Sequence, residues 1–260
     1  MQGLLNTAVK AARKGGDTVL RQVNRVHQLK VRSKAHNEFV TQVDLAAEEA
    51  IIETIRERYP DHAFLAEESG PRGSGDIVWI IDPLDGTTNF VHGFPVFAVS
   101  IALRIKAKLE VAVIYDPNRQ EIFTAIRGQG AQVDGHRIRV SGRQDLDGAL
   151  IGTGFPYRNQ EHMQYYLKML QSVLERTAGI RRPGAAAIDL AYVAAGRLDG
   201  FWEFGLQEWD IAAGSLLIRE AGGLISELQG EGDYFKSGNI VAGSPKMHDA
   251  LKKLLTPHLP

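Results

Sequence analysis

The chain has 260 residues, of which 44% are hydrophobic and 23% charged, and its formal net charge is −1. A chain of this length can bury a large core, and its balanced charge gives no global attraction to nucleic acid or anionic membranes. The absence of cysteine excludes disulfides, thiolate zinc sites and cysteine nucleophiles. No segment of signal-peptide type opens the chain, and no stretch approaches the roughly 18 apolar residues that span a bilayer. We therefore expect a cytoplasmic protein that does not bind nucleic acid directly and does not enter a membrane.

The first half of the chain opens with two predicted helices. Apolar residues recur at helical spacing over residues 4–26, and Gly15-Gly16 are expected to loosen this helix in its middle. A second helix over residues 41–59 begins with a capping-box variant, Thr41-x-x-Asp44, and ends at Pro60.

Strands follow these helices. The apolar run at residues 77–81 predicts a buried strand that ends at Asp82-Pro83. Alternating apolar residues and regular turns over residues 97–140 predict an antiparallel meander.

The second half alternates strands with helices. Strands are predicted over residues 149–153, 200–204 and 240–242; helices are predicted over residues 160–176 and 184–196, from Trp209-Asp210 to Gly222-Gly223, and from Pro245 onward. We expect an α/β (α+β) fold in which residues 1–145 and 146–260 form two halves of a single compact unit. The active site is expected at their junction.

The segment after the buried strand carries the chemistry. Asp82 would lie at the strand end, where a carboxylate is costly unless a cation neutralises it. Pro83 cannot continue the ladder, so the chain turns and can present the Leu84 carbonyl as an oxygen ligand. Asp85-Gly86 indicates a tight turn, and the N-cap residues 87–89 indicate a helix start. The segment therefore predicts a hard-cation site beside an anion site, although the spacing alone also suits a strand, a turn and a capped helix without ligands.

This segment resembles the D-P-[LI]-D-G-T-T-N-F signature of the inositol monophosphatase family. Other family matches occur in the same order as in the family: Thr41-x-x-Asp44, Ala66-Glu67-Glu68-Ser69, and Trp209-Asp210 before a helix that ends in Glu220-Ala221-Gly222-Gly223. The chain is most similar to the bacterial, SuhB-like branch, including Gly152-Thr153-Gly154-Phe155-Pro156 and Arg181-Arg182. It departs from animal members at Ala185 and at Gln207-Glu208, which affects the expected substrate rather than the reaction.

The resemblance implies a layered αβαβα sandwich of the sugar-phosphatase type and a Mg²⁺-dependent phosphoric monoester hydrolase with two or three ions. The first ion would be held by Glu67, Asp82 and the Leu84 carbonyl. The second would be held by Asp82, Asp85 and Asp210.

The family mechanism also assigns the remaining site residues. A metal-activated water would be oriented by Glu67 and Thr87, with Asp44 polarising the Thr87 hydroxyl. The Gly86 and Thr87 amides would hold phosphate oxygens. Substrate hydroxyls would meet Asp85, Glu203 and the backbone near Ala186, and Lys34 resembles a family lysine near the outer metal.

The expected reaction is hydrolysis of inositol 1-phosphate and similar polyol or sugar phosphate monoesters, by a lithium-sensitive homodimer. One alternative is a related phosphatase for fructose 1,6-bisphosphate or a nucleotide 3′- or 2′-phosphate. A second is an accessory factor in bacterial ribosomal RNA transcription antitermination, with a transcription-complex partner. A third is a non-catalytic sugar-phosphate sensor.

Overall fold

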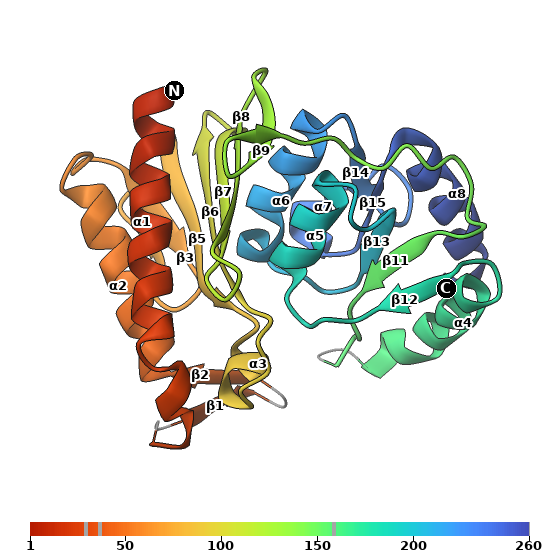
Figure 1. Cartoon of the computed structure of the whole chain (residues 1–260), viewed down its shortest axis with the longest axis horizontal. Helices are drawn as coiled ribbons and strands as arrows, with labels where there is room; N and C mark the ends of the chain where they lie inside the picture. The colour runs from red at the N-terminus through yellow and green to blue at the C-terminus, as the bar shows by residue number, and fades with distance from the viewer. Residues whose placement is uncertain (29–30, 36–37, 158–159, 260) are drawn as a thin grey trace.

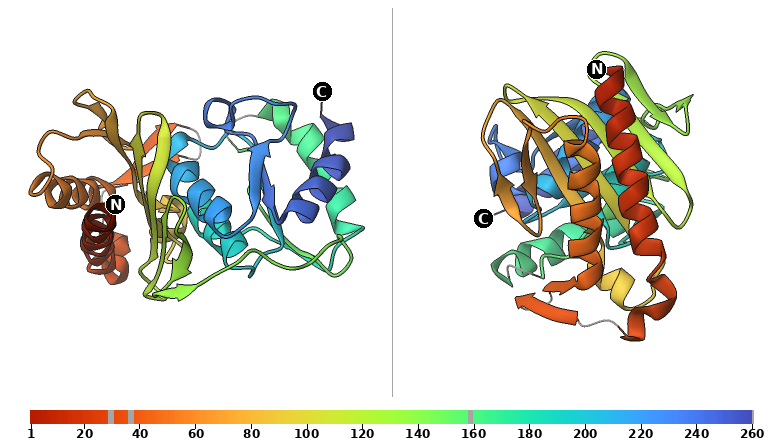
Figure 2. Two further views of the ribbon diagram at one scale, coloured as in Figure 1. Left: turned by 90° about the horizontal axis from the view of Figure 1, so that it is seen from above. Right: turned by 90° about the vertical axis from the view of Figure 1, so that its left-hand side faces the viewer.

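The computed structural model describes residues 1–28, 31–35, 38–157 and 160–259. Helices and two sheets alternate in five layers, which Figure 1 shows side by side and Figure 2 shows from two further directions. This confirms the αβαβα sandwich expected from the sequence. No helix in the described part of the chain is long and apolar enough to cross a membrane.

Helices α1 (Gln2–Leu20) and α2 (Gln42–Arg56) form the first layer, against one face of the larger sheet. The expected loosening at Gly15 and Gly16 is wrong, because α1 continues through both residues. A Cβ added at Gly15 would lie 2.7 Å from the Ile51 side chain, and one at Gly16 would lie 2.5 Å from the Tyr115 ring. The two glycines therefore allow α1 to pack closely on α2 and the sheet.

The larger sheet has eight strands in the order β10-β9-β8-β7-β6-β5-β3-β4. They are β3 (Ala63–Ala66), β4 (Gly70–Arg72), β5 (Ile77–Asp85), β6 (Ala98–Ile105), β7 (Lys108–Asp116), β8 (Glu121–Ile126), β9 (Gly130–Val133) and β10 (His136–Arg137). The predicted meander is confirmed by the antiparallel pairs from β6 to β10, whereas β3 and β4 were not predicted.

Both faces of this sheet are buried, which explains the continuous apolar run in β5. Trp79 and Ile81 pack in the core under α1 and α2, while Ile80 packs in the core on the opposite face. This alternation continues to the next residue, so Asp82 extends from the side of the sheet that Ile80 occupies.

The central helical layer consists of α5 (Ala186–Ala194) and α6 (Glu208–Glu220). Beyond it lies the five-stranded sheet, in the order β12-β11-β13-β15-β14. Its strands are β11 (Leu150–Thr153), β12 (Gly179–Arg181), β13 (Gly200–Glu203), β14 (Leu224–Glu227) and β15 (Ile240–Gly243). Helices α4 (Met163–Leu174) and α8 (Pro245–Leu255) cover its outer face (Figure 1). The predicted strands and helices of this half are confirmed, and β12 and β14 are additional.

Shorter elements complete the described chain. These are the 3₁₀ turns η1 (Val23–Gln28), η2 (Gln160–His162) and η3 (Thr256–His258), the hairpin of β1 (Val31–Ala35) and β2 (Glu38–Thr41), and the helices α3 (Thr87–Val91) and α7 (Tyr234–Ser237). The hairpin lies beside α3, the short helix that follows the Asp82–Asp85 segment (Figure 1).

Candidate active site

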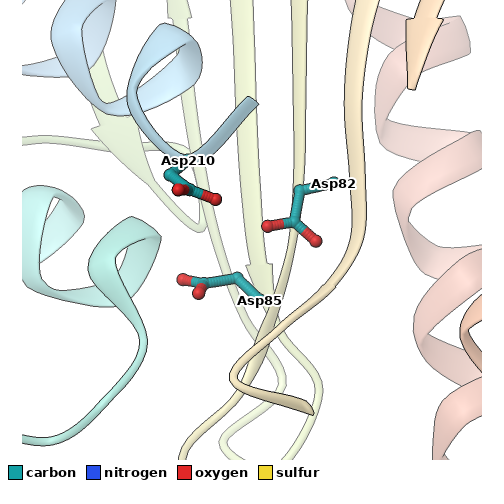
Figure 3. A group of neighbouring side chains, drawn as sticks. All are labelled: Asp82, Asp85 and Asp210. Carbon is teal, nitrogen blue, oxygen red and sulfur yellow. The ribbon is translucent and has the colours of Figure 1, made fainter. Parts of the chain in front are cut away.

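A bulge at the end of β5 brings two carboxylates to the same side of the sheet. Asp82 pairs with Ser100 of β6 and Asp85 pairs with Ala98, so β5 contains one extra residue in this interval. Residues three apart in a regular strand point to opposite faces, and the extra residue reverses this for Asp85. Figure 3 shows both carboxylates directed into the same space. The predicted strand end at Asp82 is therefore wrong, because pairing resumes at Asp85.

Asp210 reaches this space from the first turn of α6 (Figure 3). Its Oδ2 accepts a hydrogen bond from the Gln207 N–H at 2.8 Å, as part of a capping box at the helix start. Asp82, Asp85 and Asp210 each offer a carboxylate oxygen, and these oxygens lie within 4.8 Å of one another.

Backbone amides orient the two carboxylates of β5. The Leu84 N–H donates to Asp82 Oδ1 at 3.0 Å, and the Ala187 N–H of α5 donates to Asp85 Oδ2 at 2.7 Å. These contacts fix the direction of each carboxylate before any ligand binds.

The charges of the cluster are unfavourable in isolation. Burial, followed by the nearby charges of Glu67, Asp85 and Asp210, raises the pKa of Asp82 well above its usual value. Burial and then the charge of Asp210 raise the pKa of Asp85 in the same direction. Like charges in a buried position are costly unless a cation or protonation neutralises them. A group of carboxylate oxygens at this spacing, with a carbonyl beside it, fits the ligand preference of Mg²⁺.

The other two predicted metal ligands, Glu67 and the Leu84 carbonyl, belong to residues that line the same cleft. Glu67 follows β3, and its N–H donates to the Ile81 carbonyl at 3.1 Å. Leu84 is buried, and its carbonyl accepts a hydrogen bond from the Thr87 hydroxyl at 3.0 Å. The Lys34 side chain lies outside the described part of the structure.

The N-terminal acid Asp44 contacts the signature segment directly. It is fully buried at the start of α2, where its Oδ2 accepts from the Thr41 N–H at 2.8 Å in the predicted capping box. Its Oδ1 accepts from the Thr87 hydroxyl at 2.9 Å. Gly86, just before Thr87, has a φ of +95°, and a Cβ there would lie 2.9 Å from the Val96 carbonyl. The turn therefore requires glycine.

The predicted substrate residues line a cleft of about 760 Å³ that also contains the acidic cluster. Ala186 is the first residue of α5, and Glu203 is the last residue of β13. A Cβ at Gly154 would lie 1.9 Å from Glu203 Oε1, so the Gly154 backbone and this carboxylate are in close contact. The structure thus brings together residues that are far apart in the sequence.

Glu48 is a buried acid that the sequence analysis did not identify. It is 2% exposed, its Oε2 accepts from the Glu68 N–H at 2.8 Å, and its Oε1 lies 3.8 Å from Arg72 Nη2. Because Glu68 follows Glu67, this contact holds the loop that carries a predicted metal ligand. Its i+4 spacing from Asp44 on one helix face was the available signal.

Asp189, Arg182 and two histidines are further cleft residues without a predicted role. Asp189 is 1% exposed, and its Oδ1 has no hydrogen-bond partner among the described residues. His92 and His162 also line the cleft. None of these four positions belongs to a sequence motif with a defined chemical role.

Several known proteins are similar to this chain in sequence or in structure over nearly its whole length. Nus factor SuhB of Pseudomonas aeruginosa is 54% identical over 266 residues, covering 100% of this chain and 98% of that protein. The crystal structure of extragenic suppressor protein suhB from Bartonella henselae has a TM-score of 0.96 and 44% identity, covering 99% of this chain and 100% of that one. Inositol monophosphatase from Anabaena has a TM-score of 0.87 and 37% identity, covering 100% and 97% of the two chains.

A sequence model of the inositol monophosphatase family matches residues 1–259. The match includes every residue of the acidic cleft described above. The chain therefore belongs to the inositol monophosphatase family.

Proposed function

We propose that this protein is a Mg²⁺-dependent phosphatase that hydrolyses inositol 1-phosphate and similar polyol or sugar phosphate monoesters. The convergence of Asp82, Asp85 and Asp210 carries the proposal, because a buried acidic cluster needs cations and bound cations attract a phosphate dianion. Membership of the family supports the same reaction class.

Two or three ions would be held by residues of the cleft. Glu67, Asp82 and the Leu84 carbonyl would hold one, and Asp82, Asp85 and Asp210 would hold another. When bound, Mg²⁺ supplies the positive charge that offsets the carboxylates and the phosphate, and it polarises the attacking water.

Thr87 and Asp44 would orient that water. Because the Thr87 hydroxyl donates a hydrogen bond to Asp44 Oδ1 at 2.9 Å, the lone pairs of the hydroxyl oxygen can accept a hydrogen bond from water. Glu67, which lines the same cleft, would accept a proton from the same water. Thr87 is therefore assigned a positioning contact in the cleft, and Asp44 acts through it.

The remaining cleft residues would bind the substrate. The Gly86 and Thr87 N–H groups would donate to phosphate oxygens, while Asp85, Glu203 and the Ala186 backbone would contact the hydroxyl groups of the polyol.

Phosphate release from inositol 1-phosphate, with and without Mg²⁺, tests this proposal. Wild type and Asp85→Asn are compared, with the exposed Asp145→Asn as the matched control. Mg²⁺-dependent release that is lost in Asp85→Asn and kept in Asp145→Asn supports the proposal. No release by wild type from this ester, fructose 1,6-bisphosphate or a nucleotide 3′-phosphate contradicts it.

A second candidate function is a role as a partner of the bacterial transcription machinery. The observation that favours it is the name Nus factor carried by relatives such as the 54% identical protein of Pseudomonas aeruginosa. Affinity capture by the tagged protein from its own host, with Asp85→Asn in parallel, tests this role. Recovery of RNA polymerase with both proteins supports it, and recovery with neither contradicts it.

Three further properties belong to this proposal. A cytoplasmic location follows from the sequence expectations above, whereas a homodimeric state and inhibition by lithium rest on family resemblance alone. Sedimentation velocity of the purified protein tests the dimer, and phosphate release in the presence of Li⁺ tests inhibition.

A further inference from the structure

The start of α6, which carries Asp210, is joined to β6, and β6 pairs with the strand that carries Asp82 and Asp85. Asp210 reaches the acidic cluster from another layer of the fold, so its place there depends on how α6 packs on the larger sheet. The capping box orients the Asp210 carboxylate relative to its own helix only. The position of that helix relative to β5 depends on contacts between α6 and the sheet.

The first of these contacts begins at the strand position opposite Asp82. Ser100 of β6 pairs directly with Asp82 of β5, and the side chains of paired residues extend to the same face of a sheet. The buried Ser100 hydroxyl donates to the Trp209 carbonyl at 3.2 Å. Trp209 directly precedes Asp210 in the sequence. One strand pair, one hydrogen bond and one peptide unit therefore connect the two predicted metal ligands.

The second contact is an ion pair at the first residue of α6. Arg104 lies four residues after Ser100 on β6, and its Nη1 contacts Glu208 Oε1. Glu208 is the first residue of α6. Neither Arg104 nor Glu208 is among the described residues that line the cleft. Because the two contacts start from different positions on one strand, they restrain the direction of the helix start as well as its place.

Folding stability alone does not explain this ion pair. The side chains of Arg104 and Glu208 are 31% and 22% exposed, and ion pairs that water can reach contribute little to folding. Glu208 also adds a second negative charge to the helical turn that contains Asp210. Arg104 offsets this charge and engages the Glu208 carboxylate outside the cleft.

We propose that Ser100, Arg104 and Glu208 are positioning residues for bound Mg²⁺. They act through Asp210, whose carboxylate they hold close enough to the two acids of β5 to share an ion. None of the three is itself a proposed ligand. This inference rests on the metal site of the proposed function and extends it to residues outside the cleft.

Titration calorimetry with Mg²⁺ tests the inference on the whole protein. Wild type is compared with Ser100→Ala, Arg104→Gln, Arg104→Lys, Glu208→Gln and the double variant Arg104→Gln/Glu208→Gln. The matched controls are Arg197→Gln and Glu121→Gln, which remove another Arg–Glu ion pair of similar exposure, 38% and 22%. Neither control residue is among the described residues that line the cleft. Thermal melts in chelator show that each variant folds cooperatively.

The direction of the change separates positioning from a general effect of charge. Removing a positive charge strengthens the attraction of the site for a cation, and removing a negative charge weakens it. Charge alone would therefore make Arg104→Gln lower the Mg²⁺ Kd and Glu208→Gln raise it. Positioning predicts that both variants raise the Kd about 10- to 100-fold, the range for groups that orient metal ligands.

The other variants sharpen this expectation. The double variant should bind Mg²⁺ about as well as the weaker-binding single variant, because both substitutions break the same contact. Arg104→Lys keeps the charge and should recover part of the affinity. Ser100→Ala changes no charge and should also raise the Kd. Arg197→Gln and Glu121→Gln should leave the Kd at its wild-type value.

Opposite changes of the Kd in Arg104→Gln and Glu208→Gln would overturn the inference, as would an unchanged Kd in both. An equal rise in the two control variants would also overturn it. If wild type binds no Mg²⁺, the inference fails together with the metal site on which it rests. Phosphate release is measured in parallel. A wild type that binds Mg²⁺ and shows the expected differences but releases no phosphate would support the inference and contradict the phosphatase proposal.

Discussion

The Thr87 hydroxyl lies 2.9 Å from Asp44 Oδ1 and 3.0 Å from the Leu84 carbonyl oxygen, so it joins the first turn of α2 to the end of β5. Asp44 uses its other carboxylate oxygen to cap α2 through the Thr41 N–H. A single buried acid thus stabilises a helix start and orients the hydroxyl proposed to position the attacking water.

Removing this hydroxyl is expected to lower kcat and, because it leaves the buried Asp44 Oδ1 without this donor, to cost about 1–3 kcal/mol of stability. We expect Thr87→Ala to reduce kcat about 10²- to 10⁴-fold, the range for a lost proton-transfer or positioning contact. Steady-state phosphate release and a thermal melt are measured together. Thr18→Ala, which removes a hydroxyl bonded to the Lys14 carbonyl on α1, is the control. A Thr87→Ala protein with wild-type kcat would contradict the assigned role.

The charge of Asp82 is expected to lower the stability of the metal-free protein. The same carboxylate is expected to be essential for stabilisation by Mg²⁺. Asp82→Asn removes one of several buried like charges, so its melting temperature without metal should equal or exceed that of wild type at neutral pH. Saturating Mg²⁺ should raise the unfolding free energy of wild type by about 2.7 kcal/mol at 100 times the Kd, and by much less in Asp82→Asn. Calorimetric scans in chelator and in Mg²⁺ measure both effects. A variant that no longer unfolds cooperatively would make Asp82 a structural residue instead.

Glu48 is expected to control Mg²⁺ affinity through the Glu67–Glu68 loop. Glu48→Ala removes the acceptor for the Glu68 N–H and should raise the Mg²⁺ Kd about 10- to 100-fold, as for other groups that orient metal ligands. Glu48→Gln keeps an oxygen acceptor and should lie close to wild type. Titration calorimetry with Mg²⁺ measures the Kd directly. The control is Glu49→Ala, because Glu49 is more exposed and pairs with Arg72 at 3.1 Å. An equal change in both alanine variants would indicate a general effect of charge on α2.

Asp189 is expected to make stability depend on pH. Burial, followed by the charges of Glu203 and Asp85, raises the pKa of Asp189 well above its usual value. Above the ordinary carboxyl pKa of about 4, the folded state therefore binds more protons at this site than the unfolded state, so stability falls as pH rises. Asp189→Asn removes this cost.

Melting temperatures of wild type and Asp189→Asn at about pH 4 and pH 8 measure this effect, with chelator present throughout. The two proteins should be similar at the acid pH, and the variant should be the more stable one at the alkaline pH. Asp145→Asn, an exposed substitution, should show no such divergence. A gap that narrows as pH rises would mean that the Asp189 charge is favourable in the folded protein.

Local sequence patterns were sufficient for the elements whose causes are local. The Thr41–Asp44 capping box predicted the start of α2, because the side-chain contacts that cap a helix involve residues only three apart. The apolar run before Asp82 predicted a buried strand, and the turn at Gly86 followed from residues that favour a left-handed conformation. Family resemblance then identified further acidic residues, of which Glu67, Asp82, Asp85, Glu203 and Asp210 line the cleft.

Other features depended on contacts between distant segments. Spacing alone would place Asp82 and Asp85 on opposite faces of β5, and only the bulge against β6 brings them together. From the sequence alone, Gly15 and Gly16 predicted a weak point in α1. In the structure these glycines instead allow α1 to pack closely on Ile51 and Tyr115.

The sequence by itself determined the fold class, the order of most helices and strands, and the acidic residues that a cation would need. Family resemblance had led us to expect that Asp210 and Asp44 meet the signature segment, as they do in the structure. The tertiary structure alone decided that Glu48 supports the Glu67 loop and that Arg182 lies beside Asn89. The physical reason is the distance along the chain that separates the interacting residues. Capping and strand periodicity act within a few residues, whereas the meeting of side chains from different layers depends on how whole helices and sheets pack.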